Sequence, residues 1–304
     1  MASYTPRASL CQSHCNQSLT FGVDSGHEPV HPNSDISLGN LMPEQEIIPE
    51  RIISLTPSLT EILFALGLGN RISGVTDSCD FPAEAKHRPN VACWFDPDLA
   101  KLFTLKPDMV LGLQTAHYKL KHQIESRGIP VLLVNPTTVD ESLADMARIG
   151  KMLGAHERSE TLAANLRARL SALDARVKGL TGESKLTVCR ILDMEDSRFH
   201  VAGPLSFQYD IITRAGGRNV TCSTKEAYPN ITLAQLRAWD PQVIFCCGFD
   251  LNTNPGLADK HEWQSLKAVQ SDRVFTFDCN LTCRTGPRIV DMVEVLYKKL
   301  YADT

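Results

Sequence analysis

This sequence lacks an excess of charge of either sign and lacks any long hydrophobic run. In 304 residues, 31 Lys and Arg face 35 Asp and Glu, giving a net charge of −4 at pH 7. Because phosphate binding needs a basic surface, we expect no nucleic acid partner. An apolar run of about 18 residues is needed to span a membrane, and none is present. The composition, 43% hydrophobic and 22% charged, is ordinary for a soluble globular protein.

Motifs of the common catalytic sites are also missing. The chain has no H-E-x-x-H pair, no phosphate-binding loop and no evident set of nucleophile, base and orienting group. We therefore expect a binding protein and not an enzyme. A metal-dependent enzyme that uses the ten cysteines is the alternative from another functional class.

The N-terminal segment, residues 1–48, has no apolar core after a basic start, so it does not resemble a signal peptide. We expect it to be a flexible extension, because no period of 2 or 3.6 is visible in it. Cys11 and Cys15 have the spacing of a metal pair, but two incidental thiols are the preferred interpretation. Without a leader, the cysteines are expected to be reduced and the protein cytoplasmic.

From Arg51 onward, short apolar runs alternate with amphipathic segments, which predicts parallel sheets covered by helices. Ser58 and Glu61 have the spacing of a capping box at the start of the first helix. Gly67 and Gly69 end that helix, so they are a C-cap and not a dinucleotide loop. The predicted strands are 51–55, 72–76, 108–113, 130–134, 187–192, 243–247 and 274–277, and the predicted helices between them include 97–105, 119–127, 206–214 and 233–238.

A helical stretch from Val139 to Gly179, broken at Gly154, separates two such α/β regions. Its second half has one apolar face, formed by Leu162, Leu166, Leu170, Leu173 and Val177. We interpret this helix as a rigid strut between two lobes. The predicted division is an extension at 1–48, a first lobe at 49–137, a helical linker at 138–180 and a second lobe at 181–304. The helix-and-strand segments 99–110 and 233–244 echo each other, which indicates internal duplication.

An ordered set of motifs resembles the class III periplasmic substrate-binding proteins, which bind vitamin B12, haem or iron-siderophores. The set is Ser54-Leu-Thr-Pro-Ser-Leu-Thr-Glu-Ile-Leu-Phe-Ala-Leu-Gly67, Gly74-Val-Thr, Cys79-Asp-Phe-Pro82, Leu105-Lys-Pro-Asp-Met-Val110, Gly128-Ile-Pro-Val131, Gly216-Gly217-Arg-Asn219 and Asp240-Pro-Gln-Val-Ile244. The resemblance covers roughly residues 50–300. It implies two Rossmann-like lobes bridged by one long helix, with a ligand cleft between the lobes. It also implies a monomer that presents its ligand to an ABC permease, and a periplasmic or cell-surface location.

The resemblance assigns aromatic positions that grip a flat corrin to Trp94 on the first lobe and Tyr228 on the second. The ligand-facing role is the preferred interpretation of both, and the alternative is that they are ordinary core aromatics. Ser58, as the expected N-cap of the first helix, would place exposed N–H groups toward a phosphate or carboxylate of the ligand. Capping alone is the simpler interpretation, and the two are compatible.

Thiols are expected at strand ends that face the ligand. Cys79 and Cys93 flank first-lobe loops, while Cys246-Cys247 and Cys279-x3-Cys283 follow second-lobe strands. Clustered thiols bind soft metals, but a buried free cysteine is also a common small hydrophobe, and no resident metal site is predicted.

Three further residues complete the predicted ligand site. His117 follows a predicted strand, where an imidazole would reach a metal centre, although a surface-loop histidine is the preferred interpretation. Asn280 and Arg284 follow the last strand. The predicted ligand is a corrinoid, cobalamin or cobinamide, with a ferric siderophore or haem as the alternative. A siderophore needs cations, and Arg284 and Arg288 are available for one.

The permease contact departs from the pattern of the family. Relatives that feed an importer carry one docking glutamate on each lobe, and the matching positions are Ala100 and Ala234. Asp96 and Asp98 lie near the first position only. Docking through that pair of salt bridges is therefore not expected.

Overall fold

The computed structural model describes residues 48–195, 198–254 and 256–301. The first lobe contains one parallel sheet in the order β2-β1-β3-β4. The expected extension and the pair Cys11 and Cys15 lie outside the described residues, apart from Ile48. The elements of this lobe are β1 (Ile52–Ser54), α1 (Pro57–Ala65), β2 (Ile72–Val75), α2 (Leu99–Thr104), β3 (Met109–Leu113), α3 (Gln114–Glu125) and β4 (Val131–Val134), with short 3-10 turns at Gly69–Arg71 and Ala83–His87.

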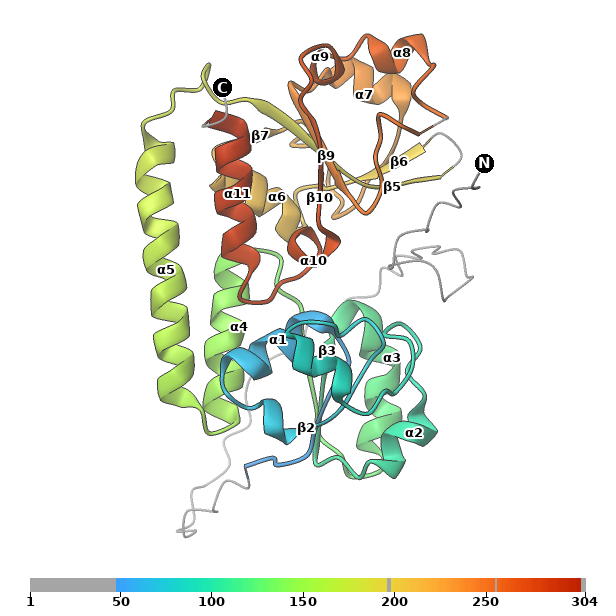
Figure 1. The fold of residues 1–304 in the computed structure, drawn as a ribbon, viewed down its shortest axis with the longest axis vertical. Coiled ribbons are helices and arrows are strands. Elements are labelled where there is room, and N and C mark those ends of the chain that lie inside the picture. The colour runs from blue at the N-terminus through green and yellow to red at the C-terminus, as the bar shows by residue number, and fades with distance from the viewer. Residues whose placement is uncertain (1–47, 196–197, 255, 302–304) are drawn as a thin grey trace, which may run out of the picture.

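Two antiparallel helices follow the first lobe, α4 (Val139–Met152) and α5 (His156–Lys178). The turn between them uses Gly154, whose φ of +70° favours glycine. Figure 1 shows α5 running alongside both lobes. The predicted leucine stripe of α5 packs into the core, with Leu166, Leu170 and Leu173 buried.

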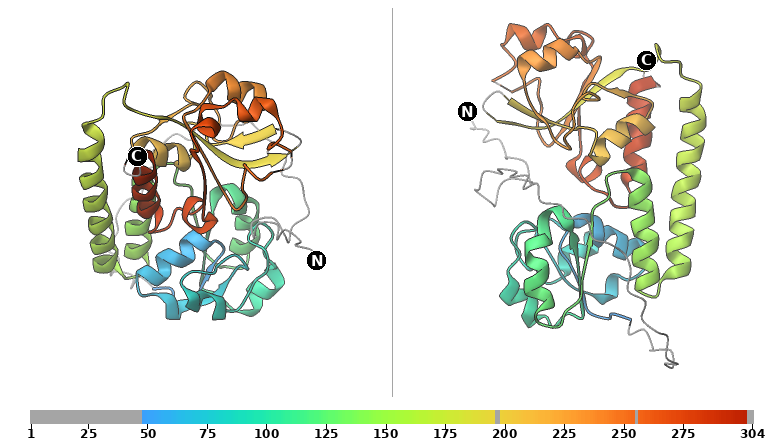
Figure 2. Two further views of the ribbon diagram at one scale, coloured as in Figure 1. Left: turned by 45° about the horizontal axis from the view of Figure 1, so that its top comes forward. Right: turned by 180° about the vertical axis from the view of Figure 1, so that it is seen from behind.

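The second lobe contains a six-stranded mixed sheet in the order β10-β9-β5-β6-β8, with β7 paired to β5. The pairs β5–β6 and β6–β8 are antiparallel, and the others are parallel. The two sheets stand one above the other, joined along one side by the helices (Figure 2). The elements are β5 (Thr187–Glu195), β6 (Arg198–Val201), α6 (Phe207–Arg214), β7 (Arg218–Asn219), β8 (Asn230–Thr232), α7 (Leu233–Trp239), β9 (Val243–Cys247), α8 (His261–Gln264), α9 (Lys267–Gln270), β10 (Val274–Phe277), α10 (Cys279–Thr282) and α11 (Ile289–Tyr301).

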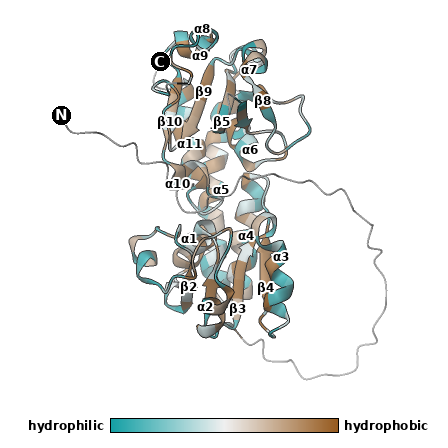
Figure 3. Ribbon diagram, turned by 90° about the vertical axis from the view of Figure 1, so that its right-hand side faces the viewer, coloured by the Kyte–Doolittle hydropathy of each residue, from teal (hydrophilic) through white to brown (hydrophobic). Residues whose placement is uncertain are grey.

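This arrangement confirms the predicted fold class of two α/β lobes bridged by a long helix. The largest apolar cluster is continuous from the first lobe through α4 and α5 to α6 and α11. In Figure 3 the strands of both lobes are coloured mostly toward the hydrophobic end of the scale. The exact domain boundaries stay a prediction. None of the described helices is long and apolar enough to cross a membrane.

Two local predictions are wrong. Ser58 is not an N-cap, because the N-cap lies two residues earlier: the Thr56 side chain accepts from the Leu59 N–H, and Pro57 opens the helix. Proline fits the first helical position because that N–H has no helical partner. The helix after β3 begins at Gln114 and not near residue 119, so His117 lies in its first turn and not in a surface loop.

Candidate functional site

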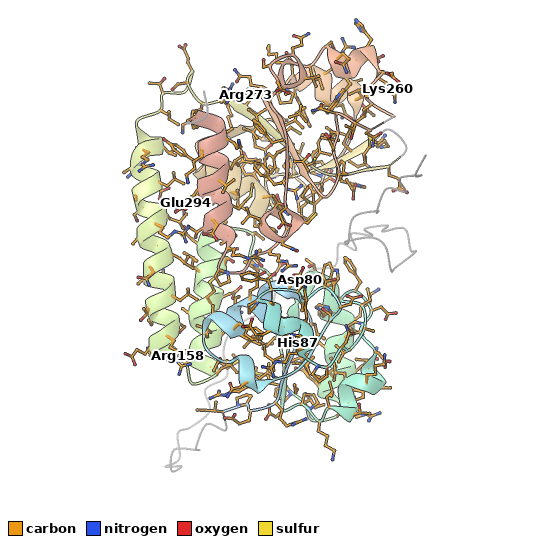
Figure 4. All side chains as sticks on the ribbon, in the orientation of Figure 1. Asp80, His87, Arg158, Lys260, Arg273 and Glu294 are labelled. Carbon is orange, nitrogen blue, oxygen red and sulfur yellow. The ribbon has the colours of Figure 1, made fainter. Side chains whose placement is uncertain are left out.

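The junction between the lobes is crossed by an ion-pair network. Arg284 of the second lobe, 7% exposed, bonds to Glu61 of α1 at 2.9 Å and to Asp80 at 2.6 Å. Arg288 bonds to the same Glu61 carboxylate at 2.7 Å, and its guanidinium carbon lies 3.8 Å from the centre of the Phe81 ring. Figure 4 shows Asp80 at the edge of the first lobe that faces the second. The network ties the two lobes together beside α1.

Burial and pairing compete in this network. Burial disfavours the charge on Arg284, but its hydrogen bonds to Glu61 and Asp80 outweigh that cost and raise its pKa above the ordinary value. Asn280 belongs to the same network, because it donates to Asp80 at 3.2 Å and accepts from Arg284. Arg284 and Asn280 therefore contact protein carboxylates, and Arg284 is not the free cation that the sequence indicated.

The start of α1 also lies at this junction. Gly286 of the second lobe approaches it so closely that an added Cβ would lie 3.2 Å from both the Ser58 carbonyl oxygen and Glu61 Oε2. Ser58 itself is buried. The first turn of α1 therefore faces the second lobe, where Ser58 meets protein backbone, and its role toward a ligand stays a prediction.

Trp94 is held in place by His117. His117 is 1% exposed, its Nδ1 accepts from the Leu113 N–H at 3.0 Å, and its Nε2 lies 2.6 Å from the Trp94 carbonyl oxygen. Because burial lowers the pKa of His117, the ring is neutral with its proton on Nε2. Both ring nitrogens are occupied, so the predicted role of His117 as a metal-facing group is not supported by its contacts. The partly exposed Trp94 ring packs against Phe95, with ring centres 3.6 Å apart.

Tyr228 is half-buried on the second lobe, in the segment that precedes β8. Its hydroxyl donates to Gln208 Oε1 at 3.2 Å. Burial raises the pKa of Tyr228 and keeps the phenol protonated. Its ring is thus fixed by α6, and its role in ligand binding stays a prediction.

Three thiols gather around a buried arginine on the second lobe. Arg190 of β5 is 1% exposed, and its Nη2 lies 3.3 Å from Cys247 Sγ and 3.2 Å from Cys283 Sγ. The two sulfurs are 3.2 Å apart. Hydrogen bonds with Cys247 and Cys279 hold the pKa of Cys283 well below its usual range, and Arg190 adds to this effect, while the same contacts raise the pKa of Cys279. Among these thiols, Cys283 is the one whose ionised form its neighbours favour.

Cys79 and Cys246 are buried outside this cluster. Cys79 is enclosed in the first lobe, where Thr60 donates to its sulfur at 3.1 Å and burial raises its pKa. Cys246 lies in the second-lobe core, and burial raises its pKa to about 11. Among the described residues, no set of three or more His, Cys, Asp or Glu side chains is arranged to hold a metal ion by itself. Because Cys79 is buried and its sulfur accepts from Thr60 of the first lobe, it faces the protein interior and not the space between the lobes.

Glu61, Asp80 and Arg190 were missed as site residues from the sequence. The capping-box pattern gives Glu61 only a structural role, and Asp80 stands only within the motif Cys79-Asp-Phe-Pro82. Arg190 did carry a signal, because it is a lone charged residue inside the apolar strand Thr187–Leu192. The two alanines at the expected docking positions, Ala100 on α2 and Ala234 on α7, are both exposed.

Comparison with known proteins finds a matching family model and a similar curated protein. The family model described as "Periplasmic binding protein" matches residues 52–281. An uncharacterized ABC transporter substrate-binding lipoprotein of Bacillus subtilis, YvrC, is 27% identical over 260 residues, which are 84% of this chain and 81% of that protein.

Two solved structures share the fold over most of the chain. The periplasmic vitamin B12 binding protein BtuF of Vibrio cholerae is 25% identical with a TM-score of 0.71, covering 84% of this chain and 98% of that one. The periplasmic heme-binding protein RhuT of Roseiflexus sp. RS-1 is 26% identical with a TM-score of 0.71, covering 83% of this chain and 98% of that one. Similar proteins thus bind either of two flat metal macrocycles.

Proposed function

This chain belongs to the periplasmic binding protein family, and we propose that it binds a corrinoid, cobalamin or cobinamide, between its two lobes. The family consists of substrate-binding components of importers, and the chain resembles both B12-binding and haem-binding members. We further propose that it is not an enzyme. Trp94 and Tyr228, one on each lobe, supply aromatic surface for the two faces of a planar ligand.

The pairing of Arg284 and Arg288 is the observation that favours a corrinoid. Both guanidinium groups are already neutralised by Glu61, and Arg284 also by Asp80. An anionic ferric siderophore, or the two propionates of haem, would have to compete with the buried Glu61 and the partly exposed Asp80 for the same cations. The amide-bearing rim of a corrin carries no such charge and needs no free arginine.

Haem or a ferric siderophore remains the second candidate, because a heme-binding structure is as similar as the B12-binding one. The expected cytoplasmic location stays a prediction. It differs from the relatives, which are named as periplasmic proteins or a lipoprotein.

A titration of the purified protein with cyanocobalamin, haemin and a ferric siderophore tests the proposal. We expect heat release and one bound cyanocobalamin per chain, with weaker binding of the two anionic iron ligands. Haemin bound more tightly than cyanocobalamin would overturn the corrinoid assignment. The matched variant is Arg288→Gln, which removes the less buried cation: it should leave cyanocobalamin binding largely unchanged.

A further inference from the structure

Arg190 is a buried cation without a carboxylate partner. Its Nη1 donates to the Ile191 carbonyl at 2.9 Å, its Nη2 contacts the two sulfurs, and its Nε has no hydrogen-bond partner. No Asp or Glu in the described part of the chain forms an ion pair with it. An uncompensated charge in the interior costs several kcal/mol, so a neighbouring group must carry the opposite charge. Among the described residues, only the thiols of Cys247 and Cys283 are in contact with Arg190 and able to do so.

Cys283 is the sulfur that a ligand can reach. It is exposed, whereas Cys247 is buried and Cys279 is only partly exposed. Cys283 ends α10 and directly precedes Arg284, which reaches across to Glu61 and Asp80 of the first lobe. The thiolate that balances Arg190 therefore stands on the face of the second lobe that is turned toward the first. Figure 1 shows α10 at that face.

We propose that Cys283 is the protein ligand of the cobalt in a bound corrinoid, an inference that rests on the corrinoid function proposed above. A thiolate held by a cation is a strong soft ligand for a transition metal. In the step, a lone pair of the Cys283 sulfur forms the Co–S bond while the water bound to cobalt(III) leaves. Cobalt keeps its oxidation state, and no proton moves because the sulfur enters ionised. Cys247 and Cys279 remain as hydrogen-bond donors to the bound sulfur and tune its basicity.

The proposal predicts a preference among corrinoids. A corrinoid with an exchangeable water on cobalt, such as aquocobalamin, gains the Co–S bond. Cyanocobalamin, whose cyanide does not exchange with a thiolate, binds through the ring contacts alone. The protein would thereby select corrinoids by the group on their metal as well as by their shape.

The test compares the two corrinoids on the wild type, Cys283→Ser and the control Cys222→Ser, which removes another exposed cysteine of the second lobe. The protein is first reduced, and the reductant is then removed under argon. With aquocobalamin, we expect the visible spectrum of a thiolate-bound cobalt(III) in the wild type and in Cys222→Ser. Cys283→Ser should lose this spectrum and bind aquocobalamin at least about tenfold more weakly, with cyanocobalamin affinity within about twofold of wild type.

Three results would overturn the inference. Cyanocobalamin binding with an unshifted aquocobalamin spectrum would leave the corrinoid function standing and remove the Co–S bond. A thiolate spectrum retained in Cys283→Ser would assign the bond to another cysteine. Failure of both corrinoids to bind would remove the proposed function and the inference with it.

A second measurement serves if Cys283→Ser does not fold. In the wild type, bound aquocobalamin should protect Cys283, but not Cys222, from alkylation by iodoacetamide, as mapped by mass spectrometry. Equal alkylation of Cys283 with and without the corrinoid would overturn the proposal. So would a Cys247–Cys283 disulfide that persists after reduction and leaves no free thiol at this position.

Discussion

Across the junction, the first lobe presents carboxylates and the second lobe presents arginines and thiols. Glu61 and Asp80 lie on one side, with Arg284, Arg288 and Cys283 on the other. The backbone plan is nonetheless shared, because α2–β3 and α7–β9 are both helices followed by a proline-led strand. Similar backbones thus carry side chains of opposite charge, and the ion pairs between them fix how the lobes face each other.

The shared plan extends to backbone conformation. Lys106 after α2 and Asp240 after α7 have positive φ values of 46° and 42°, and each directly precedes a proline. The lobes diverge elsewhere, since the second adds the antiparallel strands β6 and β8. Tyr228 directly precedes β8, so this residue of the second-lobe side of the site depends on the part that the first lobe lacks, whereas Arg190 lies on β5, which pairs in parallel with β9.

The largest effect is expected from breaking the contact between the lobes. Glu61→Gln leaves Arg284 buried with only Asp80 and Arg288 with no carboxylate from α1. Removal of one partner from a buried ion pair costs about 3–5 kcal/mol, and we expect the lower end because Asp80 remains. Urea unfolding should show this as a lower midpoint.

Glu84→Gln is the matched control, since Glu84 is an exposed carboxylate of the same lobe. Its unfolding midpoint should stay close to that of the wild type. If Glu61→Gln were equally silent, the network would contribute nothing to the way the lobes are held.

The sequence was sufficient for the fold because the strands and helices depend on local periodicity. It was also sufficient for the leucine face of α5. It was not sufficient for β6 and β8, because Arg198-Phe-His-Val201 and Asn230-Ile-Thr232 contain no continuous apolar run. Nor could it show that Arg284 is paired, because Glu61 lies 223 positions away in the chain. Charge pairing of this kind depends on how distant segments meet, which no local pattern encodes.

The next effect compares the aromatic residues of the two lobes. Trp94→Ala and Tyr228→Ala are each expected to weaken cyanocobalamin binding by about 1–3 kcal/mol, roughly ten- to a hundredfold, through loss of one stacking face. Calorimetry gives the affinities, and circular dichroism shows whether each variant is folded. Wild-type affinity in either variant would remove that residue from the site, and unfolding would assign it to the core.

A smaller, pH-dependent effect is expected in the first lobe alone. The pKa of buried His117 lies below its ordinary value of 6.5, so the unfolded chain takes up a proton at a higher pH than the folded one. The contribution of neutral His117 is complete above pH 6.5 and is lost as the pH falls from there toward the folded pKa. The loss is at most about 1.4 kcal/mol per pH unit.

The comparison of wild type with His117→Gln between pH 7.5 and 5.5 isolates this effect. The wild type should lose more stability over that range than the variant, which has no titrating group at the position. Equal slopes in urea unfolding would show that His117 does not titrate differently in the folded protein.

The smallest change is expected in the arrangement of the lobes upon ligand binding. Helix α5 contacts both: Arg158 donates to the Leu66 carbonyl at 2.9 Å at the end of α1, and Arg169 bonds to Glu294 of α11 at 2.8 Å. Figure 4 shows Arg158 and Glu294 at different levels of the helical side. Residues 156–178 contain neither Pro nor Gly, and bending an uninterrupted helix breaks its hydrogen-bond ladder.

Small-angle scattering of the free and the corrinoid-loaded protein measures this directly. We expect lobe movement of a few ångströms at most and hence nearly equal radii of gyration. Ala168→Pro is the sensitised variant, because this exposed position lies inside α5, where proline kinks a helix. This substitution should change the radius of gyration relative to the wild type, whereas loading the wild type with a corrinoid should not. A large decrease in the wild type on loading would show that the lobes close in spite of α5, and a silent Ala168→Pro would mean that α5 is not what holds them apart.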